Sequence, residues 1–216
     1  MCDYWAKQAY LARIYCKSKR KLLHKTIAPN DVRTDKMRSI MKVENRVLLS
    51  GRRSFAEVHM KIVIGADKGG FALKEAIAAR LAERGIDFED VGTVSLDACM
   101  DFVSVAERAA GIVSRGEAER GILLCGTGMG MAITANKFKG VRAAVVESQY
   151  AAEYARKIND ANILCMGGFI IGPTMGCEIV DSFIDTAFVQ DFPQWRVDFL
   201  HEEKQKLEAV EKENFK

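Results

Sequence analysis

Histidine is almost missing from this chain, and none of it lies in the central part. The three histidines are His24, His59 and His201, so residues 60–200 contain none. Histidine is the side chain that most often moves protons at neutral pH. A proton-transfer reaction carried out by this central part must therefore use another general acid or base.

Paired cysteines and long hydrophobic runs are absent as well. No two cysteines form a C-x-x-C pair, and none has a histidine at metal-ligand spacing, so we expect no metal site. No apolar run approaches the ~20 residues that a membrane span needs, and no secretory signal is recognisable. These absences predict free thiols in a reducing cytosol and no membrane contact. The six cysteines are Cys2, Cys16, Cys99, Cys125, Cys165 and Cys177.

The net charge of +3 hides an uneven distribution. Residues 1–59 hold 14 basic and 5 acidic residues, which leaves 18 basic and 24 acidic residues for 60–216. An acidic main body argues against nucleic-acid binding. We expect a basic extension over 1–59, a domain over 60–190 and a C-terminal helix over 191–216 that serves as a dimer arm. Organellar targeting by the extension is disfavoured, because Asp3 lies near its start and serine is sparse.

From Met60 onward, strand patterns alternate with helix patterns. KIVIGA, RGILLC and NILCMGG are buried-type strands, and the segments between them have the 3.6-residue period of helices. This alternation predicts an α/β fold, Rossmann-like, with three layers and a parallel sheet covered by helices on both faces. In such sheets ligands bind beyond the carboxyl ends of the strands. Asp67–Lys68, residues 125–130 and Glu147 follow three of the expected strands there.

The segment GILLCGTGMGMAITANK, residues 121–137, is the most specific feature. Its spacing does not match the dinucleotide fingerprint, and no G-K-[ST] follows as in a phosphate P-loop, so NAD and ATP are not expected. One interpretation is that Cys125 is a base, beside backbone N–H groups that bind an oxyanion. The other is that Cys125 is a small buried core residue. The local chemistry leaves both open.

From Met60 to about Arg196 the chain resembles the ribose-5-phosphate isomerase B and galactose-6-phosphate isomerase family. The resemblance rests on KIVIGADKGGFALKEAI, EDVGT, the CGTGMG loop with its following ANK, the segment 158–162 and GGFIIGP, in the family's order. It implies a Rossmann-like enzyme without metal or cofactor that forms homodimers, or tetramers, with sites at the subunit interface. Its substrates would be sugar phosphates.

The resemblance also implies site residues. Cys125 would move a proton between C1 and C2, and Thr127 with the amides of Gly126, Gly128 and Gly130 would hold the enediolate. Asp67 would contact sugar hydroxyls, and Asn159 the reacting end of the substrate. Arg196 would bind the phosphate from across the dimer. Independently of the resemblance, Lys68 is a candidate phosphate contact as a compact cation, and its alternative role is that of a solvated turn lysine. Each assignment is an expectation.

Several positions depart from the family pattern. Lys68 and Ile158 stand where histidines are usual, Phe102 replaces a tyrosine, and Phe169 and Phe192 replace arginines. The histidine at position 158 would help to open a cyclic sugar, so its loss favours a substrate that needs no opening. A tetrose 4-phosphate has its O4 esterified and cannot close a five-membered ring.

Two alternatives remain beside the tetrose substrate. One is ribose-5-phosphate isomerase activity, and the other is a non-catalytic sensor of sugar phosphates. A thiol redox role is weak, because Cys125 has no resolving cysteine near it in sequence. Arg142, Arg156 and Lys137 are the candidates to replace the missing phosphate-binding arginines.

Overall fold

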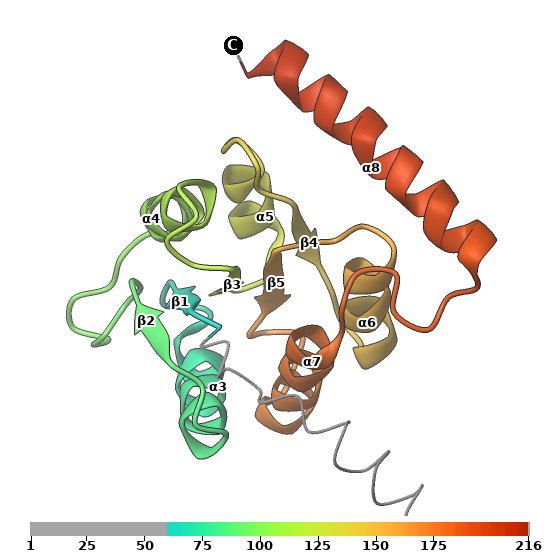
Figure 1. Cartoon of the computed structure of the whole chain (residues 1–216). Coiled ribbons are helices and arrows are strands. Elements are labelled where there is room, and N and C mark those ends of the chain that lie inside the picture. The colour runs from blue at the N-terminus through green and yellow to red at the C-terminus, as the bar shows by residue number, and fades with distance from the viewer. Residues whose placement is uncertain (1–59, 216) are drawn as a thin grey trace, which may run out of the picture. The chain divides into compact units, whose positions relative to one another are not determined.

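A computed structural model describes residues 60–215; the basic extension expected over 1–59 lies outside the described residues. The strands are short and the helices alternate with them, as the sequence predicts (Figure 1). The elements are β1 (Ile62–Ala66), α3 (Phe71–Glu83), β2 (Phe88–Asp90), α4 (Phe102–Ser114), β3 (Arg120–Cys125), α5 (Met129–Ala135), β4 (Ala143–Val145), α6 (Gln149–Lys157), β5 (Ile163–Gly167), α7 (Pro173–Asp185) and α8 (Gln194–Asn214).

The five strands form one parallel sheet in the order β2-β1-β3-β5-β4. β1, β3 and β5 are buried along their whole length, as expected of strands covered on both faces. Helices α3, α6 and α7 pack on one face, and α4 and α5 pack on the other (Figure 1). The α/β three-layer prediction is confirmed.

The order of the strands reverses between β1 and β3. From β1 the chain moves outward to β2, and from β3 it moves to the other half of the sheet. A reversal of this kind leaves a crevice outside the carboxyl ends of the two strands, which is where open α/β sheets bind ligands. Asp67 follows β1 and Cys125 ends β3, so both lie at this crevice.

Glycine, serine and proline mark the ends of several helices. Gly85 and Gly116 have φ values of 66° and 74°, just past α3 and α4. This left-handed conformation favours glycine and ends a helix. At the other end, Ser148 caps α6 by accepting a hydrogen bond from the Ala151 N–H, and Pro173 is the first residue of α7.

Helix α8 follows a connector after α7 and lies apart from the three layers (Figure 1). Leu200 is its buried residue, and Lys204 and Glu211 bind the body through Asp160 and the Gly140 N–H. Trp195 and Phe199 are 69% and 52% exposed. None of the helices between residues 60 and 215 is long and apolar enough to cross a membrane.

Candidate active site

Three loops meet at the carboxyl edge of the sheet. The Gly168 N–H donates to the carbonyl oxygen of Cys125 at 2.8 Å, and the Asp67 N–H donates to that of Leu124 at 3.1 Å. A Cβ atom on Gly70 would lie 2.4 Å from the Leu124 carbonyl, and one on Gly168 would lie 2.4 Å from the carbonyl oxygen of Gly69. The loops after β1, β3 and β5 therefore touch through backbone atoms, and the glycines are needed for that contact.

Cys125 is the last residue of β3 and is 6% exposed. Its sulfur accepts a hydrogen bond from the Gly128 N–H at 3.0 Å. Gly128 is the N-cap of α5 and has a φ of 82°, a left-handed conformation that favours glycine. A backbone N–H facing the sulfur stabilises negative charge on it, as a proton-abstracting thiolate requires.

The other residues of the loop are more open. Thr127 is exposed, Gly126 and Gly130 are partly buried, and α5 begins at Met129. The structure thus places Cys125 and Thr127 together, and it gives Gly128 a different partner from the one expected. In this conformation its N–H serves the sulfur of the base instead of a substrate oxygen.

Asp67 and Lys68 lie at the same edge, directly after β1. The Asp67 carboxylate accepts a hydrogen bond from the Gly70 N–H at 3.0 Å, which fixes the turn before α3. Lys68 is exposed. Both residues therefore stand beside the Cys125 loop, as the sequence predicts.

Two phenylalanine rings lie against the glycine loop. A Cβ atom on Gly126 would come within 2.7 Å of the Phe169 ring, and a Cβ atom on Gly69 within 3.3 Å of it. The Phe102 ring approaches Gly130 in the same way, at 2.7 Å. At two positions where the family resemblance leads one to expect polar side chains, apolar rings cover the loop. Sequence reasoning noted both substitutions but could not show that the rings contact the loop.

Asn159 lies at the opposite edge of the sheet. It follows α6 and precedes β5, whose first residue, Ile163, pairs with Gly121 near the start of β3. Because β5 runs from there to the level of Cys125, the length of the sheet separates Asn159 from the thiol. One chain therefore gathers Cys125, Thr127, Asp67 and Lys68, but not Asn159.

Asp160, next to Asn159, is the centre of an ion cluster. Its carboxylate oxygens accept hydrogen bonds from Arg156 at 2.9 Å, Arg142 at 3.1 Å and Lys204 at 2.7 Å. Burial opposes its ionisation, but the hydrogen bond from Lys204 and the charges of Arg156 and Arg142 outweigh burial and lower the pKa of the carboxyl. Arg142 and Arg156 are thus already paired, which argues against them as substitutes for the missing phosphate ligands.

Arg196 lies on the first turn of α8. Its guanidinium stacks on the Phe192 ring, 4.2 Å from the centroid, and it is near the exposed Tyr150 on α6. Phe192 in turn lies 6.4 Å from the Tyr154 ring. The contacts of Arg196 are therefore with α6 and the connector before α8.

Lys74 was not singled out in the sequence, although it is one of the most buried side chains. It is 1% exposed, and its ammonium group donates to Asp90 at 2.5 Å and to the Thr93 carbonyl oxygen at 2.6 Å. Thr93 is joined to the end of β1 through its N–H bond to Ala66. Lys74 thus holds the loop after β2 against the carboxyl edge. In the sequence, the signal for this buried lysine was its place beside the apolar Leu73 and Ile77.

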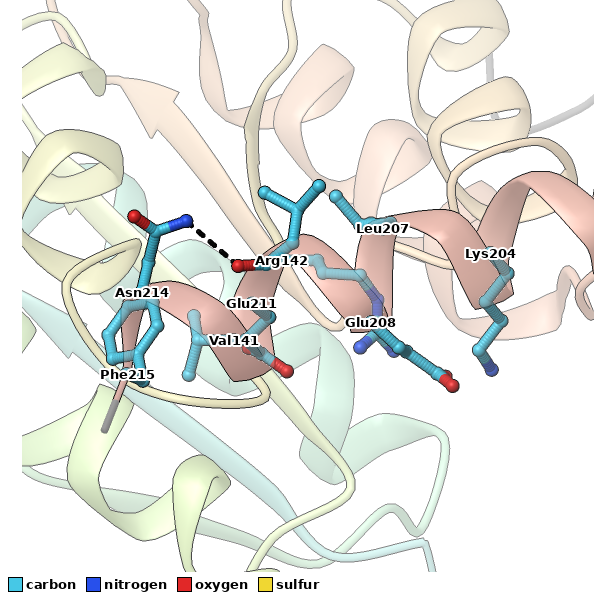
Figure 2. Close-up of a pocket in the computed structure, with 9 residues that line it drawn as sticks. Val141, Arg142, Lys204, Leu207, Glu208, Glu211, Asn214 and Phe215 are labelled. Carbon is cyan, nitrogen blue, oxygen red and sulfur yellow. Dashed lines mark hydrogen bonds between the residues drawn. The ribbon is translucent and has the colours of Figure 1, made fainter.

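A separate pocket of about 190 Å³ lies between α8 and residues 141–142 (Figure 2). Leu207, Val141 and Phe215 supply apolar walls, while Lys204 and Glu208 extend along α8. The dashed line in Figure 2 is the hydrogen bond from the Asn214 side chain to the Val210 carbonyl oxygen. This pocket lies before β4, at the amino edge, away from Cys125.

A thiol at the end of a central parallel strand, beside an amide of a glycine-rich loop, is an arrangement that suits proton transfer next to a carbonyl. The chain belongs to the ribose/galactose isomerase family, whose sequence model matches residues 62–200. It is an aldose–ketose isomerase.

Three relatives show the range of substrates named within the family. The chain is 52% identical to a 4-deoxy-4-sulfo-D-erythrose isomerase of Clostridium sp. strain MSTE9. The 152 aligned residues cover 70% of this chain and 96% of the relative. It is 44% identical to a ribose-5-phosphate isomerase B of Listeria innocua, over 68% of this chain and 99% of the relative. It is 40% identical to D-erythrulose-4-phosphate isomerase 2 of Mycolicibacterium smegmatis, over 60% and 86%.

Solved structures agree with this assignment. The ribose-5-phosphate isomerase B of Clostridium thermocellum superposes with a TM-score of 0.65 at 37% identity, covering 72% of this chain and 99% of that one. The predicted family membership is confirmed.

Proposed function

We propose that this chain interconverts an open-chain four-carbon aldose and its ketose, each carrying an acid group on C4. The observation that carries the proposal is Ile158, which stands where the family resemblance leads one to expect the ring-opening histidine. No histidine lies between residues 60 and 200. A C4 phosphate ester leaves no free O4 for ring closure, so such a substrate needs no opening. Erythrose 4-phosphate is the first candidate.

The names of the relatives support a four-carbon substrate. One is an isomerase of 4-deoxy-4-sulfo-D-erythrose, whose C4 likewise has no hydroxyl, and another acts on D-erythrulose 4-phosphate. Both are sugars that cannot form a five-membered ring through O4. The relative from Listeria innocua is named for ribose 5-phosphate, which makes that pentose the second candidate substrate.

The geometry supports a proton-transfer mechanism on a cis-enediolate. The Cys125 thiolate removes the proton from C2 of the aldose, and the electron pair of that bond forms the C1–C2 double bond as charge moves to O1. Loop N–H groups and the Thr127 hydroxyl stabilise the enediolate oxygens. The thiol then returns the proton to C1, and the proton of the O2 hydroxyl moves to O1, which leaves a C2 ketone.

We propose that the complete site needs a second copy of the chain in a homodimer. Asn159 and Arg196 do not lie with Cys125 in one chain, since Asn159 is at the other edge and Arg196 stacks on Phe192. The exposed Trp195 and Phe199 on α8 offer an apolar surface for that copy. We place the protein in the cytosol, where its free thiols stay reduced.

A substrate panel tests this function. We expect erythrose 4-phosphate to show a higher kcat/KM than ribose 5-phosphate and hexose phosphates, with deuterium from heavy water entering at the carbon next to the carbonyl. NMR detects both turnover and exchange. Faster turnover of ribose 5-phosphate would contradict the four-carbon proposal. Binding without exchange for every sugar would instead favour the sensor.

A further inference from the structure

Arginine side chains free to neutralise a doubly charged anion are scarce in residues 60–215. Six of the eight arginines in this range donate to a carboxylate or to backbone carbonyls, and a seventh contacts a methionine sulfur. Arg196, whose guanidinium is stacked on Phe192, is the eighth. The six are Arg80, Arg84, Arg115, Arg120, Arg142 and Arg156, and the seventh is Arg108.

The loop itself is walled by apolar surface instead of cations. Phe169 is 80% exposed, and its ring lies directly against Gly126 and Gly69 at the carboxyl edge. The Phe102 ring likewise lies against Gly130. Lys68 is an exposed cation in the loop that carries Gly69, and it directly follows the acidic Asp67 in sequence.

The charge of the acid group therefore matters for binding. A phosphate monoester carries about −1.5 to −2 charges at pH 7, because its second pKa is about 6. A sulfonate carries a single charge at every pH that a protein tolerates. Placing a second negative charge against apolar rings without a partner is unfavourable. A sulfonate bonded directly to carbon is also shorter, since it lacks the bridging ester oxygen.

We infer that the acid group for which this site is built is a C4 sulfonate, in preference to a C4 phosphate ester, and that Phe169 is a specificity-determining residue for that choice. The inference rests on the proposed four-carbon function and narrows it. Phe169 stands where the family resemblance leads one to expect an arginine, so its apolar ring gives a doubly charged ester no guanidinium to pair with.

The first test compares two substrates of the wild-type protein between pH 5.5 and 8. We expect kcat/KM for 4-deoxy-4-sulfo-erythrose to exceed that for erythrose 4-phosphate by about tenfold or more at pH 7.5. The ratio of the sulfonate value to the phosphate value should decrease as the pH falls through about 6, where the phosphate becomes a monoanion. Titration of the enzyme cancels in this ratio. An equal or higher value for the phosphate at pH 7.5 overturns the inference.

The second test restores a cation. Phe169→Arg should raise kcat/KM for erythrose 4-phosphate relative to the sulfonate by about tenfold. Phe169→Leu, which removes the ring and adds no charge, should leave that ratio near the wild-type value. An unchanged ratio in a folded Phe169→Arg protein counts against the role of Phe169. If that variant does not fold, the comparison of the two substrates across pH with the wild-type protein still tests the sulfonate inference.

The two proposals fail in different ways. If ribose 5-phosphate outperforms both four-carbon substrates, the proposed function is wrong. If the four-carbon substrates are the best but the phosphate is preferred, only the sulfonate inference is wrong.

Discussion

At the scale of single residues, the proposed reaction centre is mostly backbone. Cys125 and Thr127 are its proposed reactive side chains, in a loop whose other members are glycines and Met129. The sulfur is 6% exposed and is held by the Gly128 N–H. A second cysteine, Cys165, lies diagonally across on β5, where Leu123 pairs with it and Cys125 pairs with Gly167. Burial, with a smaller effect of Cys125, raises the pKa of the Cys165 thiol well above its usual range.

We therefore expect the two buried cysteines to behave differently. Cys125→Ala should lower kcat/KM by about 10²–10⁴-fold and abolish deuterium exchange, because the proton carrier is lost. Cys165→Ala should retain the exchange and lose only stability. Exchange is followed by NMR, and folding by circular dichroism. Persistent exchange in folded Cys125→Ala would show that another group is the base.

The sequence could identify the thiol and the glycine loop, because both depend on local order. It could not show that the Gly128 N–H faces the sulfur, since this depends on the folded conformation of the loop. Nor could it exclude Arg142 and Arg156 as phosphate ligands. Their pairing with Asp160 joins segments up to 18 residues apart, which only the folded chain brings together.

At the scale of elements, the ion cluster on Asp160 joins three segments. It connects the C-terminal end of α6, the start of β4 and the middle of α8 through Arg156, Arg142 and Lys204. Asp160 itself has a φ of 47°, an unfavourable value for most residues but tolerated by aspartate. The cluster therefore fixes the backbone beside Asn159 and holds α8 to the body.

We expect Asp160→Asn to destabilise the protein by about 3–5 kcal/mol at pH 7, because three cations lose a buried partner. The lowered pKa of Asp160 means that its contribution is complete above the unfolded-state pKa of about 3.9 and is lost as pH falls through the lower folded value. The difference in the free energy of unfolding between wild type and Asp160→Asn should thus become smaller below about pH 4.

Urea unfolding between pH 3 and 7 measures this difference. Glu153→Gln is the matched control, because its ion pair with Lys157 at 2.6 Å is more exposed and should contribute no more than about 1 kcal/mol. A pH-independent difference for Asp160→Asn would contradict the assignment.

The alternation of strand and helix predicted all three layers, because the apolar face of each helix is buried by packing on the parallel sheet. The same alternation also predicts the edge of the sheet at which Asn159 lies. A residue between the end of a helix and the start of the next strand lies at the amino edge, opposite Cys125. The family resemblance implies a role for Asn159 in the site, and under the homodimer proposal Asn159 reaches that site from another chain.

At the scale of the whole molecule, the prediction is a site assembled from two chains. We expect a heterodimer of a Cys125→Ala chain and an Asn159→Ala chain to recover about half of wild-type activity, because a two-fold dimer then holds one intact site of two. Each variant homodimer should be inactive. Differently tagged chains, purified together and assayed, give the measurement.

A second heterodimer provides the control. Cys125→Ala paired with Thr127→Val should recover nothing, because both residues come from the same edge of one chain and each site keeps one defect. No recovery in the Cys125→Ala and Asn159→Ala pair would mean that the two residues do not meet across a dimer.

The contact of the three carboxyl-edge loops through glycines has a consequence for how this enzyme can change. Gly70, Gly128 and Gly168 each have backbone atoms within 3 Å of where a Cβ would lie, so nearly any substitution there would push the loops apart. Lys68 and Phe169, on the same loops, are exposed to solvent. Selection for a new sugar should therefore leave the glycines untouched and accumulate its mutations at the rim, so that substrate range evolves while the proton chemistry stays the same.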